Sequence, residues 1–317
     1  MRSNRFRLLV ASTAVLALLG AACGDDDDTA TTDTSGEAEG GATFEFVALD
    51  AGGPITKDAL EKGDIDIALL FSSDGAIAAN DWVALEDDQD LQPVDNFIPA
   101  VNSAAVTDEV TAALNAVSDV LTVEAMQEMV AAVSIDGENP ADVASDFLAD
   151  ITVPEGATGD LTVGSANFAE SEITAELYAQ ALESSGATVE KKLQFGARDA
   201  YLPALISGEL DVVPEFVGTL AYYFDANADV TADLEHSLEV SRALAEANGV
   251  TLLEPAEADS INTFVVTQET ADEYGLETVS DLAEVDEPLV LGGPPECPER
   301  PLCLQGLVSV YGLKFQD

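Results

Sequence analysis

Aromatic and small polar side chains gather at the ends of several expected strands, and their chemistry fits ligand binding. In open α/β sheets, ligands sit beyond the carboxyl ends of the strands. The face of an aromatic ring attracts quaternary ammonium groups, which cannot donate hydrogen bonds. Core packing is the competing role for each phenylalanine taken alone. The candidates at strand ends are Asn167, Phe168, Phe216, Thr219, Phe71 and Asp74.

Arg300 and two cysteines occupy a proline-rich segment, PPECPERPLC, at 294–303. An arginine in so acidic a chain is suited to hold a carboxylate through two parallel hydrogen bonds, and a surface ion pair is the competing role. The spacing of Cys297 and Cys303 favours a small loop closed by a disulfide. A metal site is the alternative, but no histidine or third cysteine lies nearby.

The sequence lacks the residues of common catalytic and cofactor sites. His236 is the only histidine, and it lies among acidic residues in a helical segment. No GxSxG motif, no GxGxxG after a strand, no P-loop and no cluster of metal-ligating His and Cys occurs. We therefore expect a protein that is not an enzyme, with no catalytic residues, no metal and no cofactor.

The candidate residues lie in a pattern of alternating strands and helices, which predicts an α/β fold with mostly parallel, covered sheets. A strand at 160–168 precedes an amphipathic helix at 170–186, and strands and a helix continue to 216. Further helices are expected at 107–117, at 122–133 with Thr122 as its cap, and at 231–248. ALEKGDIDI (59–67) and ALISGELDV (204–212) repeat one unit of helix end, glycine, carboxylate and strand, so each could belong to its own lobe.

The charge balance excludes nucleic acid as a partner. The chain has 61 acidic and 11 basic residues and a net charge of −50, which repels phosphate backbones and anionic lipid headgroups. Its hydrophobic content of 47% argues for a folded chain outside the N-terminal tail. Adaptation to high salt and a generally acidic proteome are two explanations of this charge, and both remain open.

The N-terminal residues predict export and lipid anchoring. Residues 1–22 combine three arginines with an apolar stretch at 8–19, the layout of a secretory signal that is too short to span a bilayer. LGAAC is similar to a lipoprotein lipobox, in which Cys23 would be acylated; an ordinary signal peptide with an incidental cysteine is the alternative. Residues 23–43 read as an acidic, flexible tether.

Several long segments resemble the substrate-binding proteins of ABC importers for glycine betaine, choline or carnitine. VGSANFAESEITAELYAQALESSG, PALISGELDVVPEFVGT and LGGPPECPERPLCLQGL are similar to the N-terminal and middle parts of that family. The segment from DAGGPITKDALEKGDIDIALLF to LEDDQDLQP is similar to the part that follows them.

This resemblance implies the type II periplasmic-binding fold, in which two lobes with mixed, mostly parallel sheets are joined by two hinge strands. Lobe A is then expected at 72–262, and lobe B is split between 44–71 and 263–317. The hinge is expected near Leu70–Ser73 and Asn262–Val265.

The family's ligand cage implies roles for particular residues here. VPEFVGT and INTF match motifs whose tyrosines form the cage, so Phe216 and Phe264 replace tyrosines, and Val213 replaces another. Arg300 stands at the place of a carboxylate-binding arginine and Thr219 at that of a threonine that assists it. The loss of phenol hydroxyls leaves the exact ligand open.

The matching segments stand in exchanged order, which we interpret as a circular permutation with its joint near 151–159. An artefact of gene prediction or a fragment of a tandem repeat would give the same order. A permutation predicts that Asp317 lies close to Phe44–Phe46.

Together these features predict an extracytoplasmic lipoprotein, held at the outer face of the cell membrane by its N-terminal anchor. Its expected partners are a quaternary ammonium osmolyte and an ABC permease. A surface lipoprotein that senses or adheres without transporting is the alternative function.

Overall fold

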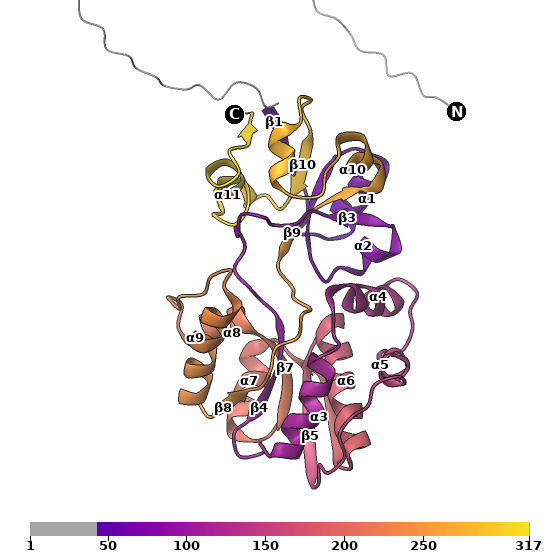
Figure 1. Ribbon diagram of the computed structural model, residues 1–317, viewed down its shortest axis with the longest axis vertical. Helices are drawn as coiled ribbons and strands as arrows, with labels where there is room; N and C mark the ends of the chain where they lie inside the picture. The colour runs from indigo at the N-terminus through magenta and orange to yellow at the C-terminus, as the bar shows by residue number, and fades with distance from the viewer. Residues whose placement is uncertain (1–42, 317) are drawn as a thin grey trace, which may run out of the picture. The chain divides into compact units, whose positions relative to one another are not determined.

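The computed structural model describes residues 43–316, which form two lobes built on one sheet each (Figure 1). The predicted signal peptide at 1–22 and Cys23 lie outside the described residues. So does the predicted tether except for Thr43, which already begins the first strand. No helix within 43–316 has both the length and the apolar character needed to cross a membrane.

Lobe A is the segment between residues 97 and 256, with a five-stranded sheet in the order β6-β5-β7-β4-β8. Its strands are β4 (Phe97–Asn102), β5 (Asp160–Ala166), β6 (Thr188–Gly196), β7 (Val212–Phe216) and β8 (Val250–Leu252). Its helices are α3 (Asp108–Ser118), α4 (Val123–Ser134), α5 (Pro140–Leu148), α6 (Ala169–Ser185), α7 (Arg198–Ser207), α8 (Val217–Phe224) and α9 (Leu234–Ala247).

Lobe B combines residues 43–91 with 262–316 in a six-stranded sheet of order β11-β1-β10-β2-β9-β3. Its strands are β1 (Thr43–Ala48), β2 (Ile67–Phe71), β3 (Trp82–Ala84), β9 (Asn262–Thr267), β10 (Val290–Gly293) and β11 (Lys314–Phe315). Its helices are α1 (Pro54–Lys62), α2 (Gly75–Ala79), α10 (Gln268–Tyr274) and α11 (Leu304–Ser309), with 3-10 turns at Ser280–Glu284 and Cys297–Glu299.

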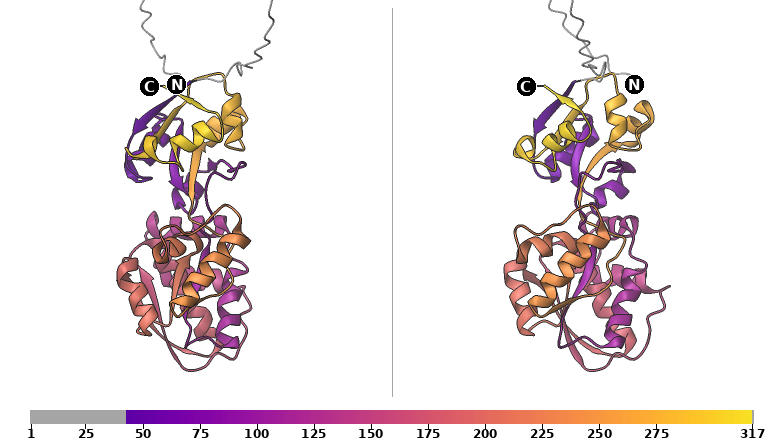
Figure 2. Two further views of the ribbon diagram at one scale, coloured as in Figure 1. Left: turned by 90° about the vertical axis from the view of Figure 1, so that its left-hand side faces the viewer. Right: turned by 60° about the vertical axis from the view of Figure 1, so that its left-hand side comes forward.

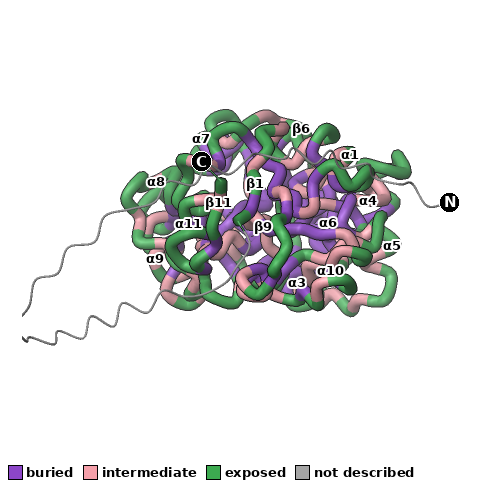
Figure 3. Tube along the Cα trace, turned by 90° about the horizontal axis from the view of Figure 1, so that it is seen from above, coloured by how far each residue is buried: buried purple, intermediate pink, exposed green. Residues whose placement is uncertain are grey.

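The predicted elements of lobe A form where the sequence places them. The helix expected at 170–186 is α6, which packs on both its neighbouring helices and the sheet and is therefore buried along most of its length (Figure 3). Gly186 ends it in a left-handed conformation with φ of 117°, which glycine adopts without a steric penalty. Thr122 caps α4 as predicted, because its hydroxyl accepts a hydrogen bond from the Ala125 amide at 3.2 Å.

The two sheets share one pattern. In lobe A, β6, β5 and β7 are parallel, β4 runs antiparallel to them, and β8 pairs with β4 on its other side. In lobe B, β11, β1, β10 and β2 are parallel, β9 runs antiparallel, and β3 pairs with β9 on its other side. In each sheet the antiparallel strand is the one that follows a crossing from the other lobe. The predicted fold of two mixed, mostly parallel sheets joined by two crossings is therefore confirmed.

The repeated sequence unit occupies equivalent places in the two lobes. Gly63 and Gly208 end α1 and α7 in the left-handed conformation, with φ of 68° and 77°. The carboxylate three residues on then binds the neighbouring parallel strand. Asp66 accepts a hydrogen bond from the Val290 amide at 2.9 Å, and Asp211 accepts one from the Thr162 amide at 2.8 Å.

The first lobe boundary and the hinge differ from the prediction. Residues 82–84 form β3 at the edge of the lobe B sheet, and Leu85 is buried in the lobe B core, so the chain cannot leave lobe B at 71–73. It crosses at 92–96 instead and returns at 257–261, just before the predicted 262–265 (Figures 1 and 2). The two crossings meet in an antiparallel bridge between Asn96 and Asp259.

The described ends of the chain lie side by side. Phe44 of β1 stands opposite Phe315 of β11, with ring centroids 5.7 Å apart, and the Gln316 amide donates to the Phe44 carbonyl at 2.9 Å. Asp317 lies outside the described residues. The circular permutation itself stays a prediction.

Candidate functional site

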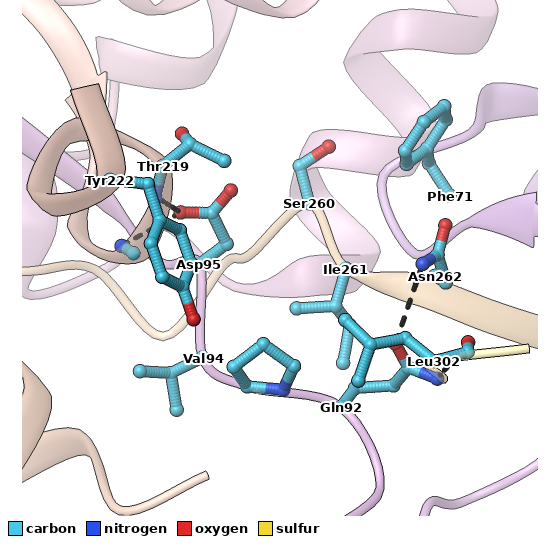
Figure 4. Close-up of a pocket in the computed structure, with 12 residues that line it drawn as sticks. Phe71, Gln92, Val94, Asp95, Thr219, Tyr222, Ser260, Ile261, Asn262 and Leu302 are labelled. Atoms are coloured by element: carbon cyan, nitrogen blue, oxygen red, sulfur yellow. Dashed lines mark hydrogen bonds between the residues drawn. The ribbon is translucent and has the colours of Figure 1, made fainter. Parts of the chain in front are cut away.

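A cavity of about 210 Å³ opens where the two crossing segments meet residues of both lobes (Figure 4). Lobe B contributes the end of β2 and one residue of the disulfide-closed loop, and lobe A contributes the first turns of α8. The remaining walls come from the crossings at 92–95 and 260–262. The lining residues are Phe71, Gln92, Pro93, Val94, Asp95, Gly218, Thr219, Tyr222, Ser260, Ile261, Asn262 and Leu302.

Two aromatic side chains from opposite lobes line this cavity. Phe71 is 46% exposed and Tyr222 is 39% exposed, so both rings offer free surface. Large aromatic side chains left open to solvent cost hydrophobic stabilisation, so paired exposure in one cavity indicates a binding surface. Aromatic faces of this kind suit a cation that cannot donate hydrogen bonds.

Asp95 lies in the cavity wall at the N-terminus of α8 (Figure 4). Its Oδ1 accepts hydrogen bonds from the backbone amides of Gly218 and Thr219, both at 2.8 Å. Burial raises its pKa to about 7, and the amide of Thr219, the charge of Arg198 and the amide of Gly218 only partly oppose this rise. The cavity therefore holds a carboxylate that lacks a full set of partners.

A buried ionic network fixes Thr219 at the edge of the cavity. Glu215 is fully buried in β7, and Arg198 binds it with two hydrogen bonds of 2.9 and 2.8 Å. Tyr201 donates to the same carboxylate at 2.8 Å. Arg198 also donates to the Thr219 hydroxyl at 2.9 Å, so the position of Thr219 depends on this network.

A second, smaller cavity of about 40 Å³ adjoins the first and shares Phe71 and Asn262 with it. Arg300 lines it, but its guanidinium binds Glu296 at 2.8 Å and is exposed. The structure joins Cys297 and Cys303 in the expected disulfide, which closes the loop that carries Arg300. Leu302 of the same loop reaches the larger cavity.

The other sequence candidates divide into two groups. Phe168 lies beside Phe216 with ring centroids 6.3 Å apart, and Phe168 is 43% exposed while Phe216 is buried and also packs on Phe97. Asn167 is exposed next to this pair. None of these three lines either cavity, although they end β5 and β7 as predicted.

Phe264 and Asp74 serve structural roles. Phe264 lies in the lobe B core, where it is 2% exposed. The cavity that it lines is a different one, of about 670 Å³, formed by residues next to β3 and on the crossings. Asp74 caps α2 through the Ala76 amide at 2.9 Å and forms an ion pair with Lys57. Phe264 was predicted to take the place of a tyrosine in the ligand cage, but its side chain packs into the lobe B core instead.

The loop after Phe71 binds lobe A and the second crossing. Gln127 of α4 donates to the Ser72 carbonyl at 2.7 Å, and the Ser73 hydroxyl donates to Glu170 of α6 at 3.2 Å. Burial raises the pKa of Glu170 and of Asp259, whose carboxylate accepts from Ser72. Ser72 and Ser73 thus hold lobe B against lobe A beside the hinge.

The sequence prediction missed Asp95, Tyr222 and Asn262 as cavity residues and Arg198 and Glu215 as their support. Glu215 carried a usable signal, because a single carboxylate inside the apolar run VVPEF must find a buried partner. Asp95 carried none, since it lies on a crossing that was placed elsewhere, and Asn262 was predicted at the hinge but not as a cavity residue. Among residues 43–316, no group of three His, Cys, Asp or Glu side chains is arranged to hold a metal ion.

Comparison with known proteins places the chain in a family. The model of the substrate-binding domain of ABC-type glycine betaine transport systems matches residues 30–150 and 159–317. The chain belongs to this family. Its members are binding proteins and not enzymes, in agreement with the lack of catalytic motifs in the sequence.

Two curated relatives have similar sequences over part of their length. The glycine betaine-binding protein YehZ of Escherichia coli (strain K12) is 30% identical over 174 residues, which cover 53% of this chain and 57% of YehZ. A glycine-betaine-binding protein of Pseudomonas aeruginosa is 30% identical over 164 residues, or 49% of this chain and 52% of that protein. The chain thus spans about half the length of the curated relatives it matches.

Solved structures of other binding proteins are more distant. The unliganded open form of the murein tripeptide-binding protein MppA gives a TM-score of 0.36 at 12% identity, covering 74% of this chain and 54% of that one. An ancestral arginine-binding protein bound to arginine gives a TM-score of 0.28 at 12% identity, covering 72% and 67%. Similarity this low does not bear on the ligand of the present chain.

Proposed function

We propose that this protein captures a quaternary ammonium compatible solute between its two lobes and delivers it to an ABC permease. The observation that carries the proposal is the cavity at the crossings, which is lined by Phe71 and Tyr222 from opposite lobes and by the carboxylate of Asp95. Aromatic faces and a carboxylate are the two kinds of group that attract an ammonium ion without hydrogen bonds. Membership of the glycine betaine family supports the same ligand class.

Closure of the lobes on the ligand supplies the signal for the permease in this proposal. The cavity draws its walls from both lobes, so a bound ligand would hold Phe71 and Tyr222 together. Two crossings joined by the bridge between Asn96 and Asp259 leave a narrow connection about which the lobes can turn.

The location proposed for the protein is the outer face of the cell membrane. The signal-like residues 1–22 and the lipobox-like sequence ending in Cys23 support a lipid anchor. Substituting Cys23 by Ser would then release the protein from membranes into the soluble extracytoplasmic fraction, as cell fractionation can measure. A Cys23→Ser protein that stays with the membrane would contradict the anchor and leave the binding function unaffected.

Calorimetric titration of the folded protein with glycine betaine, choline, carnitine and proline betaine tests the ligand class. We expect at least one to bind, and we expect Tyr222→Ala to weaken that binding by about tenfold or more through loss of an aromatic face. Tyr223→Ala is the matched control, because Tyr223 is equally exposed on the same helix but does not line the cavity. Equal effects of the two substitutions would move the site away from this cavity.

Absence of binding to all four compounds would favour the alternative of a surface lipoprotein that does not transport. The loss of family tyrosines at Phe216 and Phe264 is the feature that motivates that alternative.

A further inference from the structure

Asp95 gives the cavity a charge that the rest of its wall does not balance. Asp95 is the one aspartate, glutamate, lysine, arginine or histidine among the twelve lining residues. The nearest cation that acts on it, Arg198, is already bound through two hydrogen bonds to Glu215. A ligand in this cavity therefore meets one carboxylate, with no lysine, arginine or histidine among the lining residues.

The geometry of Asp95 leaves half of its carboxylate available. Both hydrogen bonds from α8 converge on Oδ1, as Figure 4 shows. Within the described part of the chain, no donor forms a hydrogen bond with Oδ2. A side chain that served only to cap α8 would need no more than the one oxygen, so the second is free to meet a ligand.

The adjoining cavity does not compensate for this charge. Arg300 is the cation that lines it, and its guanidinium is exposed to solvent and paired with Glu296 at 2.8 Å. An exposed and paired arginine attracts a second carboxylate only weakly. The two cavities together thus favour positive charge over negative charge in the ligand.

We propose that Asp95 is a specificity-determining residue that makes the site prefer choline-type cations, which carry no carboxylate, over zwitterionic betaines. This inference rests on the proposed quaternary ammonium function and narrows its substrate class. In a betaine, the carboxylate lies one methylene from the ammonium group, so Asp95 attracts one end and repels the other. In choline, a hydroxyl takes the place of that carboxylate and can donate a hydrogen bond to Oδ2.

The test compares Asp95→Asn with the native protein by calorimetric titration at pH 8.5, using choline, glycine betaine and the uncharged choline isostere 3,3-dimethyl-1-butanol. Asparagine keeps an oxygen that can accept from Gly218 and Thr219, so it removes the charge and preserves the cap. Asp233→Asn is the matched control, because Asp233 also caps a helix, through the His236 amide at 3.1 Å, and does not line the cavity.

We expect the native protein to bind choline more tightly than glycine betaine and far more tightly than the neutral isostere. Asp95→Asn should weaken choline binding by about tenfold or more and change glycine betaine binding by less than about threefold. Asp233→Asn should change neither. If Asp95→Asn does not fold, the affinities of the native protein for choline, glycine betaine and the isostere test the proposal by themselves.

Different results would overturn different claims. Equal weakening of choline and glycine betaine by Asp95→Asn would make Asp95 a residue that only shapes the site, and so would a native preference for glycine betaine. Either result leaves the proposed function standing. Failure of the native protein to bind any of these compounds would remove the proposed function together with the role of Asp95.

Discussion

Two carboxylates, one in the wall of the cavity and one close to it, show how the same chemical group can be structural or functional. Glu215 is fully buried, yet Arg198, Tyr201 and the Phe216 amide all donate to it, so its charge is satisfied. Asp95 receives donors on one oxygen only and faces a cavity. The number of hydrogen-bond donors to the carboxylate, more than its depth of burial, distinguishes a structural residue from one that can bind a ligand.

The raised pKa of Asp95 predicts that affinity for a cation depends on pH. Burial moves this pKa from the ordinary 3.8 to about 7, with Glu215 adding to the rise and Arg198 opposing it. A cation binds the ionised form, so below pH 7 binding must first release a proton. Choline affinity should therefore rise by about tenfold from pH 6 to pH 8 and then level off.

Ionisation of Asp95 lowers the folding stability of the protein, whereas it raises the affinity for a cation. Its pKa is higher in the folded than in the unfolded chain, so the folding stability that it contributes below pH 4 is lost as pH rises through 7. Titrations of choline between pH 5.5 and 8.5 measure the effect on binding, and Asp95→Asn should give a flat profile. A native profile as flat as that of the variant would mean that the ligand does not sense Asp95.

Among the elements, the repeated helix–glycine–carboxylate–strand unit makes the most definite prediction. Asp66 and Asp211 each accept a hydrogen bond from the strand beside them, and they do so in separate sheets. Asp66→Ala and Asp211→Ala should each lower the free energy of unfolding by about 1–3 kcal/mol, since each leaves a strand amide without its acceptor. Because the sites are far apart in structure, the losses should add in the double variant.

Chemical denaturation of the two single variants and the double variant measures these losses. Asp64→Ala in the same turn is the control, because its side chain makes no hydrogen bond or ion pair within the described residues. A loss for Asp64→Ala as large as that for Asp66→Ala would show that the turn as a whole, rather than the bond to β10, carries the effect.

Local signals placed α6, α4 and the glycine ends of α1 and α7, because periodicity, caps and left-handed glycines act within a few residues. The crossing at 92–96 could not be found this way. Whether the short strand β3 stays in lobe B depends on its pairing with β9, about 180 residues away in the sequence.

For the candidate site too, local signals in the sequence found some residues and not others. Phe71 and Thr219 were found because they follow strand ends, whereas Phe264 was assigned by motif and turned out to be buried. Burial on a strand depends on which face of the sheet the core of the same lobe covers, and no local pattern around INTF reports that. Asp95 lines the cavity from the crossing at 92–96, so it could be recognised only after the topology was known.

At the scale of the whole molecule, the charge dominates. Eleven basic residues cannot neutralise 61 acidic ones, so the chain carries a net charge of −50. Such a field raises the concentration of cations near the surface and so supports delivery of a cationic ligand to the cavity. Repulsion among the same carboxylates also destabilises the compact, folded state.

Screening of this repulsion predicts that salt stabilises the protein. The folded chain concentrates its carboxylates more than the unfolded chain does, so added NaCl should raise the melting temperature. Because the Debye length falls from about 14 Å at 0.05 M to about 4 Å at 0.5 M, most of the rise should occur in this range. Stabilisation by ion exclusion would instead continue steadily above 1 M.

Melting curves of the ligand-free protein from 0.05 to 2 M NaCl separate screening from ion exclusion, with equal osmolarities of sucrose as the uncharged control. A melting temperature that stays constant below 0.5 M would mean that the carboxylates are too well separated or hydrated to oppose folding, and the high charge would then need an explanation outside stability.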